Sequence, residues 1–518
     1  MAVTHLPSIE IYSTLTKKKS PLVTVQPGQV GMYLCGPTVY KPSHIGHMVG
    51  PVIFDTVKRH LEYSGWKVTW VVNITDVDDK IIAESTARGT TMQALAEEMT
   101  ADYLDNLAAL GVESIDEMPK ATEHIGTIIA FIEELIAKGF AYASDGDVYF
   151  DVLRDADYGK LTNRSVEQMQ GEGGSTAERK RSAADFALWK KAKPGEPSWE
   201  SPWGPGRPGW HIECSAMSKA ILGPHFDIHG GGLDLVFPHH ENEIAQSESL
   251  HDCPMATFWM HNGLMQAAGA AGKVGGRPRG GDTAADDAAA QAATKISKST
   301  GAEPFKKLLA RHDPQVIRML LLSTHYRSPI HFGEEPLAES ARAMEAFERL
   351  FVRYERIGGQ AFYPLPCRSR SEGDAVVATA GADVQALRTK FLAAMDDDFN
   401  TAIAIATLFD FVRLVNKFID QHALETKKPA AELATLEAMM LVLRELTGVL
   451  GLFMKPPQAK AGGADEGLVA KLMELVIEIR ANARKAKDFA TADLVRNKLT
   501  EAGIVLEDRP DGTGWSRK

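Results

Sequence analysis

Apolar residues in the first part of the chain follow strand-like and helix-like spacings in turn. Val30–Leu34 is a short apolar run, and Val68–Ile74 is β-branched and apolar on both faces, which is typical of a buried parallel strand. A helical pattern of apolar positions lies between these runs, formed by Val52, Phe54, Val57 and Leu61. The alternation predicts an α/β fold with a doubly wound parallel (Rossmann-type) sheet, in which ligands bind at the carboxyl ends of the strands.

This pattern is interrupted and then resumes. Residues 121–205 contain a predicted helix near Thr122–Lys138, a strand-like Asp147–Asp151 and a segment rich in Pro, Gly and Trp, KPGEPSWESPWGPGRPGW, which predicts a fixed loop. We interpret 121–205 as a connective region inserted into the sheet domain. The halves of that domain are then 1–120 and 206–334.

The second half of the chain has helical spacing. Apolar positions such as Leu337, Met344 and Phe351 recur on one face, so we expect a helical bundle over 335–455, interrupted by a looser segment at 359–382. A linker, KPPQAKAGGADEG, then leads to a small separate unit at 467–518.

Two further segments of low apolar content matter for the organisation. Residues 267–294 are low-complexity Ala, Gly and Asp, which cannot bury a core, so we expect a flexible insertion there. In the terminal unit we expect helices over 467–487 and 489–502, with Arg480, Arg484 and Lys487 sharing one face. That basic face could meet phosphates, or it could be a solvated stripe.

Composition narrows the class of protein. The 518 residues are 44% apolar and 24% charged, as in an ordinary soluble globular protein, and no run approaches the ~18 apolar residues that would span a membrane. The N-terminus has neither the charge order of a signal peptide nor the composition of a transit peptide. Four cysteines are not a disulfide framework, which indicates reducing cytoplasm. The net charge of −11 argues against blanket nucleic-acid binding but not against a local basic face.

The stretch Asp227–Glu243, DIHGGGLDLVFPHHENE, is the richest in chemistry. It places two histidines and two carboxylates behind a predicted three-glycine turn. His239 and Glu243 are four apart, so they share a face if Pro238 opens a helix, and together they supply half of a zinc site. The alternative is a polar helix start, in which the carboxylates favour the positive helix end and the histidines bond locally.

Soft ligands could come from two cysteines at predicted strand ends. Cys35 ends the first strand in CGPTVY, and Cys214 follows the Pro/Gly/Trp loop in WHIECSAM. Neither has the CxxC spacing of a zinc finger, and a lone cysteine is more often a small buried apolar residue. Cys253 and Cys367 occupy less suggestive contexts, and we interpret them as structural.

Three further clusters could bind phosphate or substrate. In PSHIGHMVG, His44, Gly46 and His47 open a helix after a strand, a site that favours an anion, although locally bonded histidines would give the same pattern. In KISKSTG, Lys295 and Lys298 could clamp a phosphate or belong to a solvated loop. TDVDDK (75–80) could bind a substrate amine or ribose, or cap the next helix.

Taken together, these motifs resemble the class I aminoacyl-tRNA synthetases, and within that class the cysteinyl-tRNA synthetases. HIGH (44–47) and KISKS (295–299, a variant of KMSKS) are the two signatures of the class, in the expected order. The resemblance covers nearly the whole chain. Its supporting stretches are YLCGPTVYKPSHIGH, NITDVDDK, RPGWHIECSAM, FDIHGGGLDLVFPHHENEIAQS, WMHNG, MDDDFNTA and GIVLEDRPDGTGW.

The resemblance implies a zinc site and an amino-acid pocket. The family's zinc ligands fall on Cys35, Cys214, His239 and Glu243, with one zinc ion per chain contacting the thiolate of the substrate cysteine. This ion would separate cysteine from serine, since a pocket that reads shape alone discriminates such near-isosteres by only ~10². His240 and Glu241 are then neighbours rather than ligands. The positions expected to line the pocket are Thr75, Trp210 and His229.

The reaction implied has two steps and uses ATP with Mg²⁺. L-cysteine is activated to cysteinyl-adenylate and is then transferred to the 3′ end of tRNA(Cys). His44, Gly46 and His47 are expected at the ATP phosphates, and Lys298, with Lys295 secondary, at the departing pyrophosphate. The terminal unit resembles the family's anticodon-binding module, and we expect a cytoplasmic monomer.

One departure and three rival functions remain. Relatives reach KMSKS soon after the WMHNG-like strand, whereas residues 267–294 intervene here and could slow the KISKS loop or touch tRNA through Lys273, Arg277 and Arg279. A related ligase could join cysteine to an amino-sugar, but such relatives lack the terminal module. A catalytically dead tRNA-binding regulator is disfavoured by the intact signatures. A zinc hydrolase is disfavoured because no HExxH arrangement is present.

Overall fold

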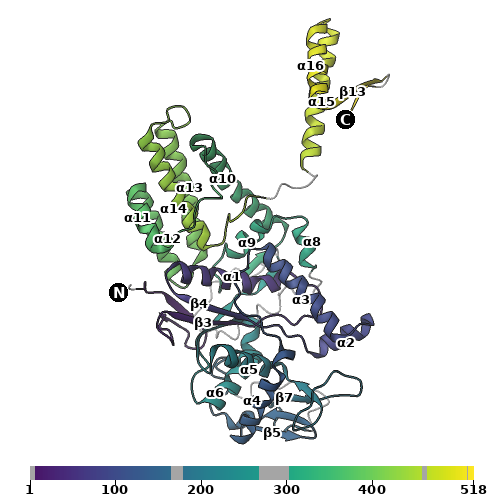
Figure 1. Ribbon diagram of the computed structural model, residues 1–518, viewed down its shortest axis with the longest axis vertical. Coiled ribbons are helices and arrows are strands. Elements are labelled where there is room, and N and C mark those ends of the chain that lie inside the picture. The colour runs from purple at the N-terminus through teal and green to yellow at the C-terminus, as the bar shows by residue number, and fades with distance from the viewer. Residues whose placement is uncertain (1–5, 165–178, 268–302, 458–463, 510–511, 518) are drawn as a thin grey trace, which may run out of the picture. The chain divides into compact units, whose positions relative to one another are not determined.

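The computed structural model describes residues 6–164, 179–267, 303–457, 464–509 and 512–517. The chain forms two compact units, Met1–Pro456 and Pro457–Lys518. The first unit contains a parallel sheet, an inserted antiparallel sheet and a bundle of helices (Figure 1). The finer boundaries at 120, 205 and 334 stay predictions.

The central sheet has four parallel strands in the order β10-β9-β3-β4. Its strands are β3 (Gln29–Leu34), β4 (Lys67–Val72), β9 (Phe226–Gly232) and β10 (Ala256–Asn262). Most of their residues are buried because helices cover the sheet, so the near-continuous apolar runs in β3 and β4 form strands without alternation. The predicted α/β class with a parallel sheet is confirmed.

The three glycines at 230–232 are not a turn, as the sequence analysis expected, but the last residues of β9. Gly230 pairs with Met260 across the sheet, and a Cβ there would lie 1.9 Å from the ring of Phe54. Close helix packing, rather than chain reversal, therefore requires glycine at this strand end.

Helix α1 (Ile45–Tyr63) lies against the sheet and reaches the bundle. Its predicted face, which includes Val52, Phe54 and Val57, is buried. The other helices flanking the central sheet and its edges are α2 (Asp79–Arg88), α3 (Met92–Ala109), α5 (Trp210–Leu222), α6 (Glu241–His251), α8 (Phe305–Leu309) and α9 (Pro314–Leu322). Short strand pairs are formed by β1 (Glu10–Ser13) with β2 (Lys18–Pro21), and by β11 (Met265–Ala267) with β12 (Ile330–Phe332).

The inserted region has its own sheet and core. Its sheet has the order β5-β6-β7-β8 and is antiparallel, and α4 (Ile125–Ala137) packs against it. The strands are β5 (Ala141–Ser144), β6 (Asp147–Phe150), β7 (Phe186–Lys191) and β8 (Gly206–Pro208), with 3₁₀ turns at Ala121–His124 and Val152–Arg154. The prediction of a loop throughout the Pro/Gly/Trp segment was wrong at β8, which pairs with β7. Pro208 is tolerated there because β8 is an edge strand, in which one side needs no backbone donor.

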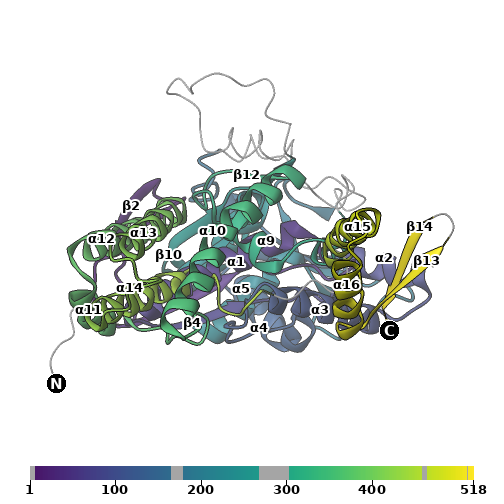
Figure 2. The same cartoon turned by 90° about the horizontal axis from the view of Figure 1, so that it is seen from above.

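The bundle comprises α10 to α14, which pack together in Figure 2. Their bounds are α10 Glu334–Gly358, α11 Arg370–Ala380, α12 Ala382–Asp396, α13 Thr401–Gln421 and α14 Ala430–Val449. The expectation of a loose segment at 359–382 was wrong, because α11 occupies half of it. A capping box between Ser369 and Glu372 begins α11, although few of its residues are apolar and buried.

The second unit has α15 (Ala464–Lys485), α16 (Phe489–Glu501) and a hairpin of β13 (Ile504–Arg509) and β14 (Gly512–Arg517). The expected basic face on one helix was wrong in two respects. Arg480 is buried, with 6% of its surface exposed, and Lys487 lies beyond the end of α15 with a left-handed backbone (φ 61°). Helix α15 ends at Lys485, two residues before the predicted end, because the chain turns there toward the start of α16 at Phe489.

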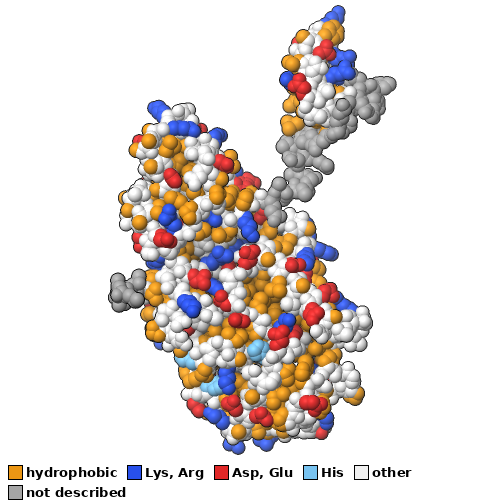
Figure 3. Space-filling view, viewed as in Figure 1, with side chains coloured by type: hydrophobic (Ala, Val, Ile, Leu, Met, Phe, Trp, Pro, Cys, Tyr) orange, Lys and Arg blue, Asp and Glu red, His pale blue; other side chains and the backbone are white. Residues whose placement is uncertain are grey.

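Across the described residues, none of the helices combines the length and apolarity needed to cross a membrane. Charged side chains of both signs are scattered over the face seen in Figure 3.

Arg318 on α9 joins the sheet domain to the bundle. It is fully buried, pairs with the buried Asp55 of α1, and donates to the carbonyl oxygens of Leu110 and Leu450, which end α3 and α14. Burial would raise the pKa of Asp55, but Arg318 and Arg59 lower it below its ordinary value, so the carboxylate stays charged.

We therefore expect Arg318→Met to lower the free energy of unfolding by about 3 kcal/mol or more, since it leaves a buried carboxylate short of its partner. Denaturant unfolding of the whole chain measures this. Arg349→Met is the matched control, because Arg349 is 69% exposed and its pair with Glu345 should contribute under about 1 kcal/mol. Equal midpoints for the two variants would contradict the assignment.

Candidate active site

A cavity of about 550 Å³ opens at the carboxyl ends of β3, β9 and β10. This is the edge at which ligands of doubly wound sheets bind, because the strand order leaves a crevice there. Its lining residues are Leu34–Thr38, Tyr40, His44, Gly46, His47, Val49–Pro51, Lys80, Tyr103, Trp210, Gly231, Gly232, Asp234, Leu235 and Asn262–Met265. It therefore contains the predicted HIGH motif, one of the candidate cysteines and the glycine end of β9.

The HIGH motif forms the first turn of α1. His44 is the N-cap, and its Nδ1 accepts a hydrogen bond from Gly46 N at 3.1 Å. His47 Nδ1 accepts from His44 N at 3.3 Å, and the two rings stack with centroids 3.9 Å apart. Because Nδ1 is the acceptor in each neutral ring, Nε2 carries the proton and is a donor. The histidines are thus locally bonded, as one reading expected, and they also line the cavity.

Four candidate ligands from distant segments converge behind this wall. Cys35 directly follows β3, Cys214 lies in α5, and Glu243 lies in the first turn of α6. The fourth, His239, belongs to an irregular turn at Val236–His240, in which Phe237 has an extended backbone, and this turn follows a 3₁₀ turn at Leu233–Leu235. The regular helix therefore begins at Glu241 rather than at Pro238. His239 and Glu243 still share a face.

The ligand atoms have the spacing of a tetrahedral site. The Sγ atoms of Cys35 and Cys214 are 3.8 Å apart, and Cys214 Sγ lies 3.5 Å from His239 Nε2. Glu243 Oε1 lies 3.4 Å from Cys35 Sγ and 3.0 Å from His239 Nε2, and all four ligand atoms lie within 4.8 Å of one another. A tetrahedral zinc ion with bonds of about 2.0–2.3 Å requires ligand separations of roughly 3.3–3.8 Å, so these residues fit the ion.

A second donor set overlaps the first. His229 and His240, with Cys35 and Glu243, also lie within 4.8 Å of one another. His229 Nε2 is 2.8 Å from Glu243 Oε2, whereas His240 Nε2 is 4.0 Å from Glu243 Oε1. This set has one thiol instead of two, and zinc prefers thiolate ligands, so the first set fits the ion better.

The four candidate ligands and His229 bring groups of opposite charge together in a buried place. Burial would raise the pKa of Glu243, but His229 and His239 hold it well below its ordinary value. Burial would lower the pKa of His239, but Glu243 and Cys214 raise it to about 10. Burial would raise the pKa of Cys214, yet hydrogen bonds from Cys35 and His239 lower it to about 6, while Cys35 itself has a raised pKa.

The three predicted pocket residues occupy different positions. Trp210 lines the cavity and stacks on His239, with ring centroids 4.1 Å apart. Thr75 is 1% exposed and donates to Glu213 Oε2 at 2.9 Å. His229 is fully buried, stacked on Trp259 and bonded to Glu243. Among the described residues that line the cavity, Thr75 and His229 are absent, so their direct contact with a substrate stays a prediction.

Sequence reasoning missed His211. Its Nδ1 lies 2.9 Å from Nδ1 of His239, on the side of that ring away from the other ligands. Burial and His239 hold the pKa of His211 well below its ordinary value, so it is neutral and can accept this hydrogen bond. Metal-binding histidines are usually oriented by such a partner. The available signal was its spacing of three from Cys214, which puts both on one face of α5.

Sequence reasoning also missed the partners of Glu241. Its carboxylate accepts hydrogen bonds from the backbone N–H groups of Gly159, Leu161 and Thr162, which anchor the inserted region. Glu241 is therefore a buried structural carboxylate, which agrees with its interpretation as a neighbour of the ligands. These backbone partners carry no sequence signal.

Lys295, Lys298 and the insertion 267–294 lie, apart from Ala267, outside the described residues. The chain on either side of that stretch lies at the cavity. Met265 lines it, and Phe305 N donates to the carbonyl oxygen of Ser43, next to the HIGH motif, at 2.7 Å.

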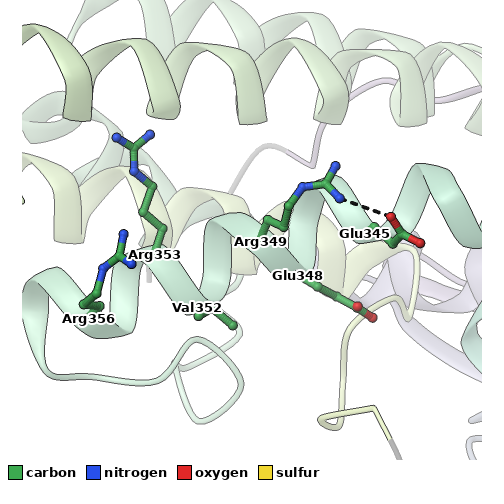
Figure 4. A pocket seen from close by; sticks show the side chains of 6 residues that line it. All are labelled: Glu345, Glu348, Arg349, Val352, Arg353 and Arg356. Carbon is green, nitrogen blue, oxygen red and sulfur yellow. Dashed lines mark hydrogen bonds and ion pairs between the residues drawn. The ribbon is translucent and has the colours of Figure 1, made fainter. Parts of the chain in front are cut away.

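A second hollow of about 510 Å³ lies on α10 (Figure 4). Its arginines are already neutralised, because Arg349 pairs with Glu345, while Arg353 and Arg356 both pair with Glu425. Its lining residues include the carboxylates Glu345 and Glu348 but no histidine, cysteine or serine, so it is not a candidate active site.

Comparison with known proteins gives a consistent result. Residues 21–271 match the catalytic domain of tRNA synthetases class I (C), residues 390–454 a DALR domain, and residues 473–515 the cysteinyl-tRNA ligase anticodon binding domain. The chain is 43% identical to a cysteine–tRNA ligase of Symbiobacterium thermophilum over 98% of this chain and 99% of the relative. It is 43% identical to that of Geobacter sulfurreducens over 99% and 100%, respectively.

A solved structure shares the fold. The Mycobacterium tuberculosis methionyl-tRNA synthetase bound by methionyl-adenylate aligns with a TM-score of 0.57 and 14% identity, over 83% of this chain and 91% of that chain. At this identity the likeness concerns the fold alone.

Proposed function

This chain belongs to the cysteine–tRNA ligases, and from that premise we propose that it activates L-cysteine with ATP and transfers it to the 3′ end of tRNA(Cys). Membership makes it an aminoacyl-tRNA synthetase. The observation that carries the finer proposal is the position of Cys35, which belongs both to the four-ligand cluster and to the wall of the cavity that holds the HIGH motif. A thiol bound at the cluster would therefore lie in the same cavity as ATP.

The chemistry has two steps. The cysteine carboxylate attacks the α-phosphate of ATP in line, pyrophosphate leaves, and cysteinyl-adenylate remains. The terminal ribose hydroxyl of the tRNA then attacks the carbonyl carbon of this anhydride, and AMP leaves. Enzymes accelerate such steps mainly by positioning the reactants and by stabilising developing charge.

Residues at the start of α1 would bind the phosphates of ATP, which arrives with Mg²⁺. The Nε2–H groups of His44 and His47 are donors, and Gly46 lets the phosphates approach the helix N-terminus closely. No acidic residue stands in the first turn to repel them. Lys298, with Lys295 secondary, would neutralise the pyrophosphate as it departs.

Cys35, Cys214, His239 and Glu243 would hold a zinc ion, which would supply an affinity for the thiolate of cysteine that a serine hydroxyl lacks. Trp210 would pack beside the substrate and fix the ring of His239. Thr75 and His229 would support the pocket, Thr75 through Glu213 and His229 through Glu243.

A tRNA acceptor is favoured over an amino-sugar acceptor by residues 473–515, which match an anticodon-binding domain. In that unit Arg484 remains a candidate for contact with phosphate. We also propose that the insertion 267–294 either slows closure of the KISKS loop or contacts the tRNA.

The proposed reaction is tested by cysteine-dependent exchange of pyrophosphate into ATP, followed by charging of tRNA(Cys). We expect exchange with cysteine, none above background with serine, and transfer to tRNA but not to an amino-sugar. Absence of exchange with the metal-loaded protein would refute the adenylate step. Exchange with transfer only to the amino-sugar would refute the acceptor.

The zinc ligands are tested by Glu243→Gln and Cys214→Ser. We expect each to lower the zinc content below one ion per chain and to raise the KM for cysteine by more than about tenfold, because even the groups that orient zinc ligands contribute that much. Metal analysis and exchange kinetics measure both effects.

Two matched controls accompany this test. Glu241→Gln alters a buried carboxylate two residues from Glu243, and Cys253→Ser alters a cysteine outside the cluster. Both should keep their zinc. A zinc-free Cys214→Ser variant with wild-type kinetics would show that the ligand assignment is wrong.

Lys298 is tested by substitution with alanine. We expect the rate of adenylate formation to fall about 10²–10³-fold, as on removal of one donor to a developing charge, with unchanged binding of cysteine. Single-turnover kinetics and calorimetry separate the two quantities. Lys390→Ala, at a lysine paired with Asp410 on the bundle, is the control. A parallel loss of cysteine binding would mean that Lys298 has a different role.

A further inference from the structure

We propose that Asp398 is a positioning residue for the cavity wall at Gly263–Met265, although it lies in the bundle and touches no part of the cavity. Asp398 occupies the short loop between α12 and α13, inside the MDDDFNTA stretch to which the reaction gives no role. The inference rests on the proposed function, because it assigns this part of the wall to the ATP side of the cavity.

The backbone at this loop is held in an unusual conformation. Asp398 has a φ of 61° and Phe399 a φ of 51°, both in the left-handed region that a bulky residue such as phenylalanine rarely adopts. Both side chains are buried, at 0% and 2% exposure. Such a conformation persists only where the surroundings over-determine it, and it is often found where a side chain must point in one direction.

The direction of Asp398 is set by three donors from two distant segments. Its Oδ1 accepts from the backbone N–H of Tyr12 at 2.9 Å and from the hydroxyl of Tyr326 at 2.8 Å. Its Oδ2 accepts from Arg327 Nε at 2.9 Å and lies 3.5 Å from His325 Nε2. One buried carboxylate thus ties β1 to the loop between α9 and β12.

The first of these segments contacts β10, and the second contacts the residues that directly follow it. On the β1 side, Trp259 N donates to Ser13 Oγ at 3.1 Å, Thr14 N donates to the carbonyl oxygen of Trp259 at 2.9 Å, and Thr14 Oγ1 is 2.9 Å from His261 Nδ1. The end of β1 is therefore bonded to the carboxyl half of β10.

On the other side, the loop that contains Tyr326 is hydrogen-bonded directly to the cavity wall at Gly263 and Leu264. Gly263 N donates to the carbonyl oxygen of Tyr326 at 2.8 Å, and Ile330 N donates to that of Leu264 at 3.1 Å. A Cβ at Gly263 would lie 2.1 Å from the carbonyl oxygen of Ser328, so the two segments pack too closely for a side chain at this position. Gly263 and Leu264 line the cavity, and a shift of the loop would move them.

The charge of Asp398 is needed because, in the part of the chain that the structure describes, the groups bonded or paired to its carboxylate are donors or cations. In Asp398→Asn the amide nitrogen would face a donor, one of the three hydrogen bonds would be lost, and the Arg327 guanidinium would lose its buried counter-charge. The ligand cluster does not include any residue that contacts Asp398. The effect should therefore fall on ATP more than on cysteine.

The test compares three full-length variants by pyrophosphate exchange. We expect Asp398→Asn to raise the KM for ATP by about tenfold or more, because small displacements of positioning groups are costly. The KM for cysteine should change less than about threefold and the zinc content should not change. Tyr326→Phe, which removes one hydroxyl donor, should raise the KM for ATP by about threefold.

Asp397→Asn is the matched control. It makes the same change at the neighbouring carboxylate, which is 57% exposed and pairs only with Lys19 among the interactions described for it, and it should behave as the wild type.

Two results would overturn the proposal. One is a folded Asp398→Asn variant with a wild-type KM for ATP or with equal increases for both substrates, as a merely structural role would give. If Asp398→Asn does not fold, a wild-type KM for ATP in Tyr326→Phe overturns it instead. Failure of the wild-type protein to exchange pyrophosphate would instead refute the proposed function. This result is distinguishable from a failure of the Asp398 proposal, in which the wild-type protein remains active.

Discussion

The buried carboxylate of Glu243 is the constraint on which the site depends. An ionised group at 0% exposure requires compensating positive charge or donors, and Glu243 obtains them from His229 on β9 and His239 in the preceding turn. Cys35 donates to the same carboxylate from the end of β3. The charge of Glu243 therefore holds together the end of β3, the end of β9 and the start of α6. Because water cannot reach this carboxylate, polar side chains must surround it.

Helix α1 connects the cavity to the helical bundle. Its N-terminus is the histidine cap at the cavity, and its C-terminus is bonded to the bundle, where His60 contacts Asp396 at 2.9 Å and Tyr63 donates to Glu445. Arg318 joins the same helix to α3 and α14 from the middle. Asp396 and Asp398 stand two residues apart, so one stretch of the bundle holds both the far end of α1 and the loop behind β10.

Under the proposed function, the enzyme must separate two amino acids that differ by one atom, and the donor set of the cluster offers a physical basis for this separation. Shape alone discriminates weakly between a thiol and a hydroxyl, whereas a metal ion held by two thiols, an imidazole and a carboxylate would select by the chemistry of the ligand atom. His211, neutral and buried, orients His239 from behind. The scaffold therefore supplies rigidity, and the discrimination is proposed to come from the donor set.

Local patterns in the sequence predicted most of the elements of this protein, with β8, the glycine end of β9 and α11 as exceptions. The apolar runs at Val30–Leu34 and Val68–Ile74 predicted buried strands, and the pattern around His44 and His47 placed these histidines at a helix start. The four proposed ligands were identified by resemblance, since nothing in their spacing shows that Cys35 lies 3.8 Å from Cys214. Only the tertiary structure decided that convergence, the strand at 230–232 and the contacts of His211, Glu241 and Asp398. Each depends on a contact between segments far apart in the chain, and such contacts leave no period or local signal in the sequence that could announce them.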